Sequence, residues 1–522
     1  DNSKKPKKSS GGIQREKRML SAIAALNLSW RNQLYLDITG RNDWSSALVY
    51  ANGTGNHSYF YPSVSGSWII SETFRDDLPE WISFAKLRGS WAQVGNDTDA
   101  YYVNQAYGFS SIEMPNGTNI YTNTLNQTMK SANLKPERKN AWEIGLDFRT
   151  LNNRLNLDVT YYKENTKDQI MEIAVPSISG VNSQLINAGN IQNQGWEVAL
   201  NTIPFQNEDW EWGLNFTWTK NTSKIVELHP DAAEYIPLQG QVNLYDYRIG
   251  SVAKVGGEYG LLMTDILPAR DDQGRILLNY SSNRRAVYQR RSGKVEELGS
   301  MQPDFLGSVS TDLRWKDLSL HVGLDMRIGG LVAMYSNRYG SNSGWTKSSL
   351  AYRDKEHGGL TWTSKFPECN GVTFEDGVIL EGVFAPGTTA TGIDGKAHDI
   401  SGMTHQEAVD AGIIEPTHAS AYHVFRNAWG EGTINDDWVH KLSYIALRDI
   451  TLSYRMPKTI ASKIGAKNLG VSLSARNLGY IYNSLPNNVH PESVRGNRAA
   501  EFRIRGYEPY VANYTFTINA EF

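Results

Sequence analysis

The chain has 522 residues, a formal net charge of −3 and a mean hydropathy of −0.47. Such a balanced charge gives no reason to expect nucleic acid as a partner. The single cysteine, Cys369, excludes an internal disulfide and any multi-cysteine metal site. No apolar run approaches 18 residues, so no transmembrane helix is expected. The 27 tyrosines and 15 tryptophans favour surfaces where water meets an apolar phase.

Strand-like segments recur from end to end of the chain. Most are longer than ordinary soluble strands of about 5–6 residues and reach the roughly 9–11 residues needed to cross a bilayer. They are expected at 17–30, 33–46, 59–71, 83–95, 138–150, 153–166, 191–204, 210–221, 304–315, 317–330, 444–456, 468–479 and 514–522.

Many of these segments contain runs that alternate between apolar and polar residues. Residues 142–149 place Trp142, Ile144, Leu146 and Phe148 on one face, and charged residues on the other. A soluble core would not accept so many charges in mid-strand, because buried unpaired charges are costly. A water-filled lumen accepts them, with lipid against the apolar face.

The connections between the strands alternate in length. Tight turns such as 31–32 and 152–153 alternate with long loops, a pattern typical of outer-membrane barrels. A soluble propeller would show a repeat of about 40–50 residues, and the sequence contains none. We therefore expect an all-β fold, a transmembrane antiparallel β-barrel over residues 17–522, after a flexible basic segment at 1–16 on the extracellular side. The extracellular loops are expected at 47–58, 96–137, 168–190, 222–303, 331–441 and 480–511.

The strand count indicates part of a larger barrel. About thirteen spanning strands are expected, whereas bacterial barrels close with an even number. Plugged outer-membrane transporters have about 22. The chain is therefore interpreted as the C-terminal part of a larger barrel.

An ordered set of short stretches resembles the SusC/RagA family of TonB-dependent outer-membrane transporters. The set spans nearly the whole chain: 37–46, 59–68, 86–97, 134–137, 142–147, 186–197, 299–305, 447–454, 475–478 and Phe522. One such match is a weak signal, but the set in this order is specific.

The resemblance implies a bacterial outer-membrane importer of oligosaccharides or oligopeptides, without choosing between them. It implies a 22-strand barrel, of which this chain is the C-terminal part, with an N-terminal plug and a TonB-contacting segment, which this chain lacks. It also implies the energising proteins TonB, ExbB and ExbD. It also implies a SusD-like surface lipoprotein over the mouth, and an assembly signal at Phe522. A passive porin and a structural or adhesin barrel remain as alternatives.

The polar positions of the strands are candidates for the lumen wall. They could contact substrate or plug, or could form cross-strand ion pairs worth roughly 0.2–1 kcal/mol each. The candidates are Asp37, Arg41, Asp43, Glu143, Asp147, Arg149, Asp158, Glu197, Asp312, Arg314, His321, Asp325, Arg327, Asp449 and Arg476. The loop aromatics Tyr335, Tyr339, Trp345 and Tyr352 are candidates for substrate or lid contacts, or for packing within the loop.

No enzymatic site, metal or cofactor is expected. His321 and Asp325 share a face, but on a strand they would lie about 13 Å apart, too far for a hydrogen bond. No nucleophile elbow stands at a strand end. The other histidines lack metal-ligand spacing, and residues 271–274 fit a turn better than a calcium loop.

Overall fold

The computed structural model describes residues 15–175, 178, 180–229, 234–240, 248–426, 430–494, 500–506 and 510–522. It forms two compact units: residues 1–200 with 221–234, and residues 201–220 with 235–522. Strands β10 (Ser183–Gln206) and β11 (Trp210–Glu227) contribute residues to both. Of the basic segment expected at 1–16, residues 1–14 lie outside the described residues. No helix in the described ranges is long and apolar enough to span a membrane.

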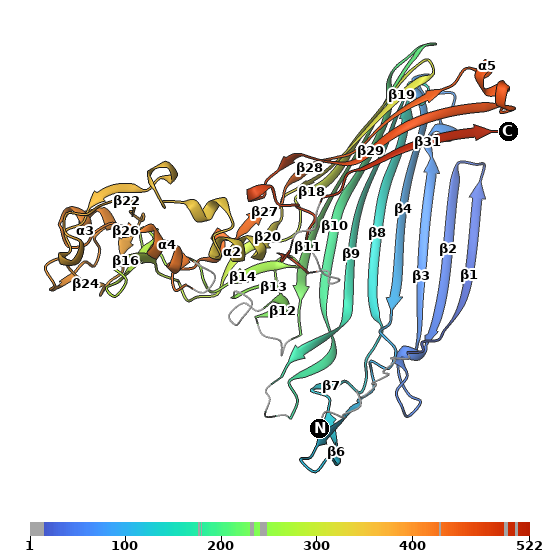
Figure 1. The fold of residues 1–522 in the computed structure, drawn as a ribbon. Coiled ribbons are helices and arrows are strands. Elements are labelled where there is room, and N and C mark those ends of the chain that lie inside the picture. Colours follow the sequence, from blue (N-terminus) through green and yellow to red (C-terminus); the bar gives the residue numbers. More distant parts are fainter. Residues whose placement is uncertain are drawn as a thin grey trace. The chain divides into compact units, whose positions relative to one another are not determined.

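Long antiparallel strands, joined mostly by short turns at one end, build the sheet of the first unit (Figure 1). Turn residues Arg31, Asn32, Asn152 and Asn153 adopt positive φ, a conformation that asparagine tolerates better than most residues. The strands, in spatial order, are β1 (Met19–Trp30), β2 (Leu34–Ser45), β3 (Ser58–Ile69), β4 (Ile82–Asn96), β8 (Glu137–Thr150) and β9 (Leu155–Ala174).

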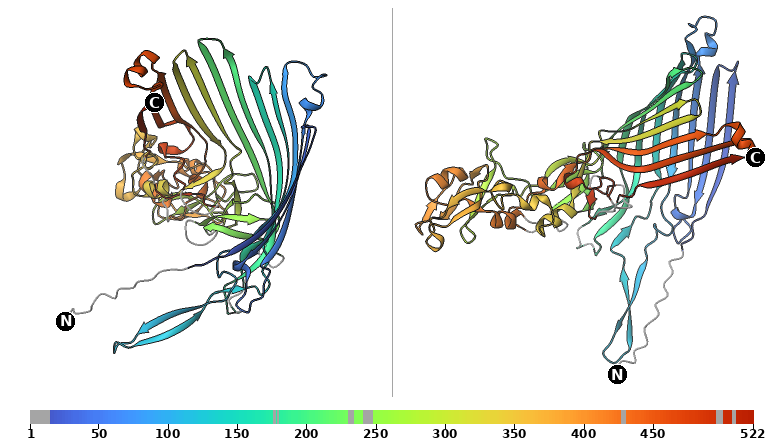
Figure 2. Two further views of the ribbon diagram at one scale, coloured as in Figure 1. Left: turned by 90° about the vertical axis from the view of Figure 1, so that its right-hand side faces the viewer. Right: turned by 45° about the horizontal axis from the view of Figure 1, so that its top comes forward.

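At the opposite end of this sheet the longer connections fold on themselves. Leu48, Tyr59, Val103, Leu134 and Leu185 form a buried cluster there. Strands β5 (Tyr107–Glu113) and β6 (Asn119–Leu125) form a separate hairpin, which Figure 2 shows projecting from the strand ends. Short strand β7 (Thr128–Lys130) pairs in parallel with the start of β10, and helix α1 (Ile70–Thr73) follows β3.

The second unit repeats the antiparallel arrangement. After the first half of β11 come β18 (Phe305–Trp315), β19 (Leu318–Ile328), β28 (Tyr444–Arg455), β29 (Asn468–Asn483) and β31 (Asn513–Glu521). The β18–β19 turn passes through Lys316, and helix α5 (Lys458–Ala461) lies between β28 and β29. A β-bulge interrupts the register of β28 between Leu447 and Asp449.

The 331–441 excursion shares a hydrophobic core with the 222–303 segment. Leu278, Val287, Phe384, Ile400 and Ala408 are among its fully buried members, so strands from the 222–303 segment complete it. Its elements are β20 (Leu331–Met334), α2 (Tyr335–Asn342), β21 (Leu360–Thr363), β22 (Thr373–Val378), β23 (Val383–Phe384), β24 (Thr389–Thr391), β25 (Ala397–Asp399), α3 (His405–Asp410), β26 (Thr417–His418), α4 (Ala419–Arg426) and β27 (Val439–Lys441).

The remaining short strands belong to the 222–303 and 480–511 segments. They are β12 (Tyr235–Gly240), β13 (Ile249–Lys254), β14 (Leu261–Thr264), β15 (Leu277–Ser281), β16 (Ala286–Gln289), β17 (Glu296–Ser300) and β30 (Arg503–Ile504). Strands β14 and β15 overlap the apolar stretches at 259–265 and 275–279.

Several strands extend beyond the boundaries that the sequence indicated. β9 continues to Ala174 rather than 166, β10 begins at Ser183 rather than 191, and β11 continues to Glu227 rather than 221. The loops expected at 168–190 and 222–303 are correspondingly shorter. The extensions are rich in polar residues and lose the apolar alternation from which the boundaries were inferred, although their backbones remain extended.

Candidate functional site

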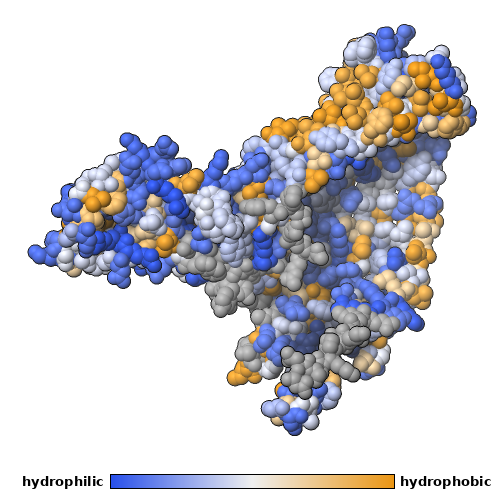
Figure 3. Space-filling view, viewed as in Figure 1, coloured by the Kyte–Doolittle hydropathy of each residue, from blue (hydrophilic) through white to orange (hydrophobic). Residues whose placement is uncertain are grey.

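The strand register sorts each sheet into an apolar face and a polar face. In the first unit, Trp142 lies opposite Trp91 and Leu146 lies opposite Leu87, whereas Asp147 lies opposite Lys86 and Asp158. Because side chains alternate along a strand and neighbours are in register, every strand adds to both faces. We call the two sides the apolar face and the polar face. Figure 3 shows hydrophobic residues gathered over β28, β29 and β31 of the second unit.

On the polar face of the first unit, one arginine crosses an intervening strand. Arg88 on β4 donates hydrogen bonds of 2.7 Å to each carboxylate oxygen of Asp158 on β9, and one of 2.6 Å to Thr160. Gly145 of β8 lies between them, and a Cβ there would be 2.6 Å from Arg88 Nε. The glycine therefore leaves the space through which the guanidinium reaches Asp158.

Other candidates on this face pair locally. Arg41 Nε lies 2.7 Å from Asp43 Oδ1, and the hydroxyl of Tyr61 also donates to Asp43. Arg149 pairs with Asp147 at 3.0 Å. Three further candidates complete this set: Asp37 accepts from Asn27, while Glu143 and Glu197 occupy polar-face positions of β8 and β10.

In the second unit, His321 lies between two carboxylates. Its Nδ1 is 2.6 Å from Asp312 Oδ1, and its Nε2 is 3.2 Å from Asp449 Oδ2. Asp325, the acidic partner first considered for it, is paired instead with Arg448 at 2.6 Å. Asp312, His321 and Asp449 thus connect β18, β19 and β28. Their contacts join a base to two acids, without a nucleophile.

The other candidates of the second unit lie around this group. Arg314 pairs with Glu211 at 3.3 Å, Arg327 donates to the carbonyl of Met301 at 3.0 Å, and Arg476 lies opposite Asp449 in the register. Among the described residues, no cluster of three or more His, Cys, Asp or Glu side chains could hold a metal ion.

Strict alternation did not identify Arg448. In the pairing of β28 with β19, Leu447 lies opposite Leu324, and Asp449 lies opposite the adjacent residue, Gly323. Arg448, between Leu447 and Asp449, is the extra residue of the bulge. A bulge places two residues of one strand opposite one residue of its neighbour. The side chains of Arg448 and Asp449 consequently both lie on the polar face. The signal in the sequence was the adjacent Arg448 and Asp449 pair, which breaks the two-residue period of an otherwise alternating strand.

Arg448 fastens the connection after β29 to the sheet. It donates hydrogen bonds of 2.9 and 2.5 Å to Glu492, which also accepts from Tyr480 at 2.8 Å. Burial raises the pKa of Glu492, but the hydrogen bonds from Arg448 and Tyr480 outweigh burial and leave the pKa below its ordinary 4.5. His490 lies 2.8 Å from the hydroxyl of Tyr480. The cluster therefore combines a charged network with aromatic rings.

The four loop aromatics divide into two kinds. Tyr335 is buried in the core of the second unit, and Tyr352 packs edge-on against Tyr422 with ring centroids 5.2 Å apart. Tyr339 and Trp345 are 47% and 84% exposed. Tyr335 thus packs the loop itself, whereas Tyr339 and Trp345 are accessible to a partner or substrate. Tyr352 also lines a 580 Å³ cavity with Arg353 and Arg426.

Phe522 directly follows β31. It falls on the same face as Phe516 and Ile518, and its ring is 71% exposed, while Lys467 donates to its backbone oxygen at 3.0 Å. The terminal ring therefore continues the apolar face of this strand.

Comparisons with known proteins agree on one kind of barrel. Residues 6–259 match a family model described as TonB dependent receptor-like, beta-barrel. TonB-dependent receptor P3 of Formosa agariphila is 24% identical over 482 residues, covering 89% of this chain and 41% of that protein. TonB-dependent receptor SusC of Bacteroides thetaiotaomicron is 26% identical over 302 residues, covering 53% of this chain and 29% of that protein.

Solved structures of the RagAB peptide transporter have the same fold. One aligns with a TM-score of 0.65 at 16% identity, covering 97% of this chain and 47% of that chain. Another, of the importer in its open-open state, aligns with a TM-score of 0.66 at 19% identity, with the same coverage. The chain thus spans less than half the length of the relatives that it matches.

Proposed function

We propose that this relative of the SusC/RagA family of TonB-dependent receptors, a resemblance that the matches confirm, forms the C-terminal wall of an energised outer-membrane importer. The observation that carries the proposal is the division of both sheets into an apolar face and an ion-paired polar face. Such a wall suits lipid on one side and a hydrated passage on the other. The polar-face candidates are proposed to line that passage.

Two rows of aromatic rings support placement in the outer membrane. In the first unit, Trp81 packs against Phe148 near one end of the strands, and Trp91 and Trp142 are register partners further along β4 and β8. Residues 81 and 91 are separated by about 34 Å along a strand, or about 26 Å across a bilayer at a tilt of roughly 40°. The apolar band of outer-membrane barrels is about 25 Å tall.

The second unit has the same spacing by itself. Trp210 and Trp315 stack at one end of β11 and β18, with ring centroids 5.8 Å apart. Trp218 and Phe305 lie 6.4 Å apart towards the other end. Phe305 and Trp315 begin and end β18, so the band there has a similar height. Aromatic girdles at both interfaces are characteristic of membrane barrels.

The edges of strands β1 and β31 support the inference that further strands complete the barrel. Among the described residues, β1 pairs only with β2, and β31 pairs only with β29. Unpaired strand edges are not tolerated in lipid. We infer that the other strands of a 22-strand barrel, its plug and the TonB-contacting segment belong to parts of the full-length protein beyond this chain, which supplies less than half of its relatives' length.

The long connections are proposed to face the exterior and to hold a SusD-like surface lipoprotein. The 331–441 excursion packs around a core that it shares with the 222–303 segment, and it presents Tyr339 and Trp345 to solvent. Deleting the tip of the 331–441 excursion should reduce co-purification of the lipoprotein with the full-length protein, while the barrel remains folded. Full retention of the lipoprotein would contradict this role.

The substrate is proposed to be an oligosaccharide or an oligopeptide. RagAB is a peptide transporter by name, whereas the aromatic and amide side chains of the outer loops suit either ligand. Parallel binding screens of glycans and peptides with the full-length protein would select one class.

The test of energised import is the dependence of uptake on TonB. Cells expressing the full-length protein should accumulate the bound ligand, and removal of TonB or dissipation of the proton gradient should abolish accumulation. Uptake that persists without TonB would favour a passive porin. Binding without any uptake would favour an adhesin or structural barrel.

A further inference from the structure

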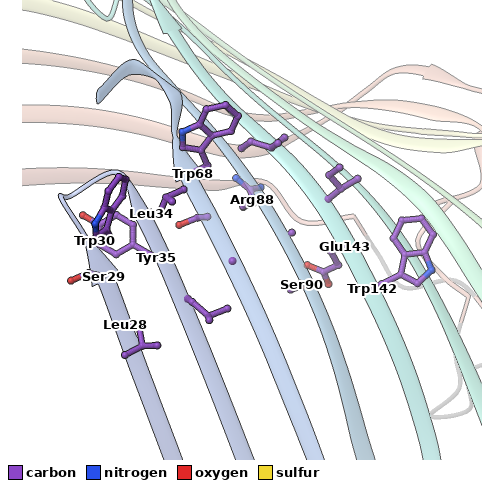
Figure 4. A pocket seen from close by; sticks show the side chains of 16 residues that line it. Leu28, Ser29, Trp30, Leu34, Tyr35, Trp68, Arg88, Ser90, Trp142 and Glu143 are labelled. Carbon is purple, nitrogen blue, oxygen red and sulfur yellow. The ribbon is translucent and has the colours of Figure 1, made fainter. Parts of the chain in front are cut away.

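A groove of about 720 Å³ is cut into the apolar face of the first unit. Its floor follows one row of register partners across five strands: Leu28, Leu36, Gly66, Gly89 and Ile144. The row is apolar throughout, but two neighbouring strands place glycine where the adjacent strands place leucine or isoleucine. Figure 4 shows the groove with the side chains that line it.

The two glycines create the groove by leaving space empty. A Cβ built on Gly66 would meet only the carbonyl oxygen of Tyr35 at 3.8 Å, and one on Gly89 only that of Glu143 at 3.8 Å. Neither glycine has a positive φ, so neither is required by backbone conformation. A larger side chain would fit at both positions and would fill the groove.

Large side chains flank the groove, a whole row of them on the side of the β1–β2 turn and one tryptophan on the other side. Trp30, Leu34, Trp68 and Leu87 form the next row towards the β1–β2 turn, and Trp142 stands on the opposite side.

A cationic side chain lies beside the groove at the β1–β2 turn. Arg31, in the β1–β2 turn, places its guanidinium carbon 4.7 Å from the ring centroid of Trp30. Trp30 is half exposed on the apolar face and lines the groove. An apolar slot beside an exposed cation complements an amphiphile with a hydrocarbon chain and an anionic head.

We propose that this groove binds one acyl chain of an anionic phospholipid, with the phosphate at Arg31. The proposal rests on the proposed function, because it requires the apolar face to meet lipid. Retention comes from shape and charge, since burial against protein gives no hydrophobic gain over bulk lipid. A hydrocarbon chain also brings no backbone groups that would need partners in the membrane.

Photolabelling of the full-length protein tests the site. The protein is reconstituted in vesicles of phosphatidylethanolamine and phosphatidylglycerol, doped with phosphatidylglycerol that carries a diazirine in one acyl chain. Labelled peptides are mapped by mass spectrometry. We expect labelling of the peptides around Leu28, Leu36 and Ile144 to exceed that of the apolar face around Leu473 and Phe516 several-fold.

Filling the groove provides the decisive comparison. Gly66→Ile and Gly89→Ile should each reduce groove labelling about fivefold. Gly470→Ile is the matched control, because a Cβ there also meets only a carbonyl oxygen at 3.8 Å, but the residue lies on the polar face opposite Asn519. Heat-modifiability on a gel verifies that each variant is folded. Arg31→Gln should remove any preference for phosphatidylglycerol over a phosphatidylcholine probe with the same chain.

Each contrary result has a distinct meaning. Uniform labelling of both apolar surfaces, or labelling unaffected by Gly66→Ile and Gly89→Ile, overturns the groove while leaving the membrane placement intact. Absence of labelling from both surfaces overturns the membrane placement itself. An unchanged lipid preference in Arg31→Gln overturns the phosphate site.

Discussion

Arg448 binds both carboxylate oxygens of Glu492, a residue 44 positions later in the chain, with hydrogen bonds of 2.9 and 2.5 Å. The arginine lies in a bulge of β28, and the glutamate lies in the connection that follows β29. Bidentate arginine–carboxylate pairs fix orientation as well as distance. A long connection is thus tied to the polar face by a residue that an unbroken strand would have turned towards the apolar face.

Replacing Arg448 by methionine should loosen this connection. Hydrogen bonds to charged groups contribute about 1.5–3 kcal/mol, and the partial exposure of both side chains places this pair towards the lower value. Hydrogen exchange of residues 484–494 should accelerate, while that of β28 and β29 stays slow. Arg476→Met, on the same face, is the control. Equal protection in Arg448→Met and the wild type would contradict the role of the pair.

Gly145→Val should separate Arg88 from Asp158. The new side chain occupies the space where the guanidinium crosses β8, and because both partners are more than one-third exposed the loss should be at most about 1 kcal/mol. This loss of stability is measured by a double-mutant cycle with Asp158→Asn, in which the thermal stability of each variant is followed by heat-modifiability on a gel. Gly213→Val, whose Cβ would meet Asp312 at an ordinary 3.6 Å, is the matched control. Additive effects of Gly145→Val and Asp158→Asn would show that the glycine does not serve this pair.

The pH dependence of the 331–441 excursion should follow His405. Its ring is fully buried, Nδ1 accepts from the backbone N–H of Leu380 at 3.0 Å, and burial lowers its pKa from 6.5 to about 4. The unfolded segment therefore binds more protons than the folded one between these values. Stability should fall as pH drops from 6.5 towards 4, by roughly 3 kcal/mol in all.

Hydrogen exchange of residues 380–414, corrected for its intrinsic pH dependence, checks this expectation. His405→Gln should flatten the profile, because glutamine keeps an acceptor for Leu380 but does not titrate. A wild-type profile that is already flat would exclude His405 as its source.

The alternation of faces was predictable because it is a local property of every extended strand. The residues that share a face therefore follow from sequence spacing alone. The partner of Arg88 was not predictable, because Asp158 lies 70 positions away and its proximity depends on the register of three strands. Arg448 was missed because a bulge shifts the period by one residue. The core of the excursion, which includes Phe384 and Ile400, was not visible because its strands are too short to show a period.

Spin labels at two adjacent positions test the orientation of the faces. Leu146 lies opposite Leu87 on the apolar face, and Asp147 lies opposite Lys86 on the polar face. A label at 146 should be more accessible to oxygen, which concentrates in lipid, and a label at 147 to a water-soluble relaxation reagent. The reverse order would reject the assignment of lipid and lumen sides.

Substitution of Phe522 distinguishes an assembly signal from an interfacial anchor. Its ring is exposed on the same face as Phe516, and the two are 71% and 65% exposed. Losing one ring costs about 1–3 kcal/mol of burial at most, too little to unfold a large barrel. If Phe522 acts as the signal, Phe522→Ala should reduce the amount of full-length protein in the membrane, while the assembled fraction keeps its thermal stability. Phe516→Ala removes the same ring from the same face and should leave the yield unchanged. Normal yield of Phe522→Ala with reduced thermal stability, measured by heat-modifiability on a gel, would instead identify the ring as one member of the aromatic girdle.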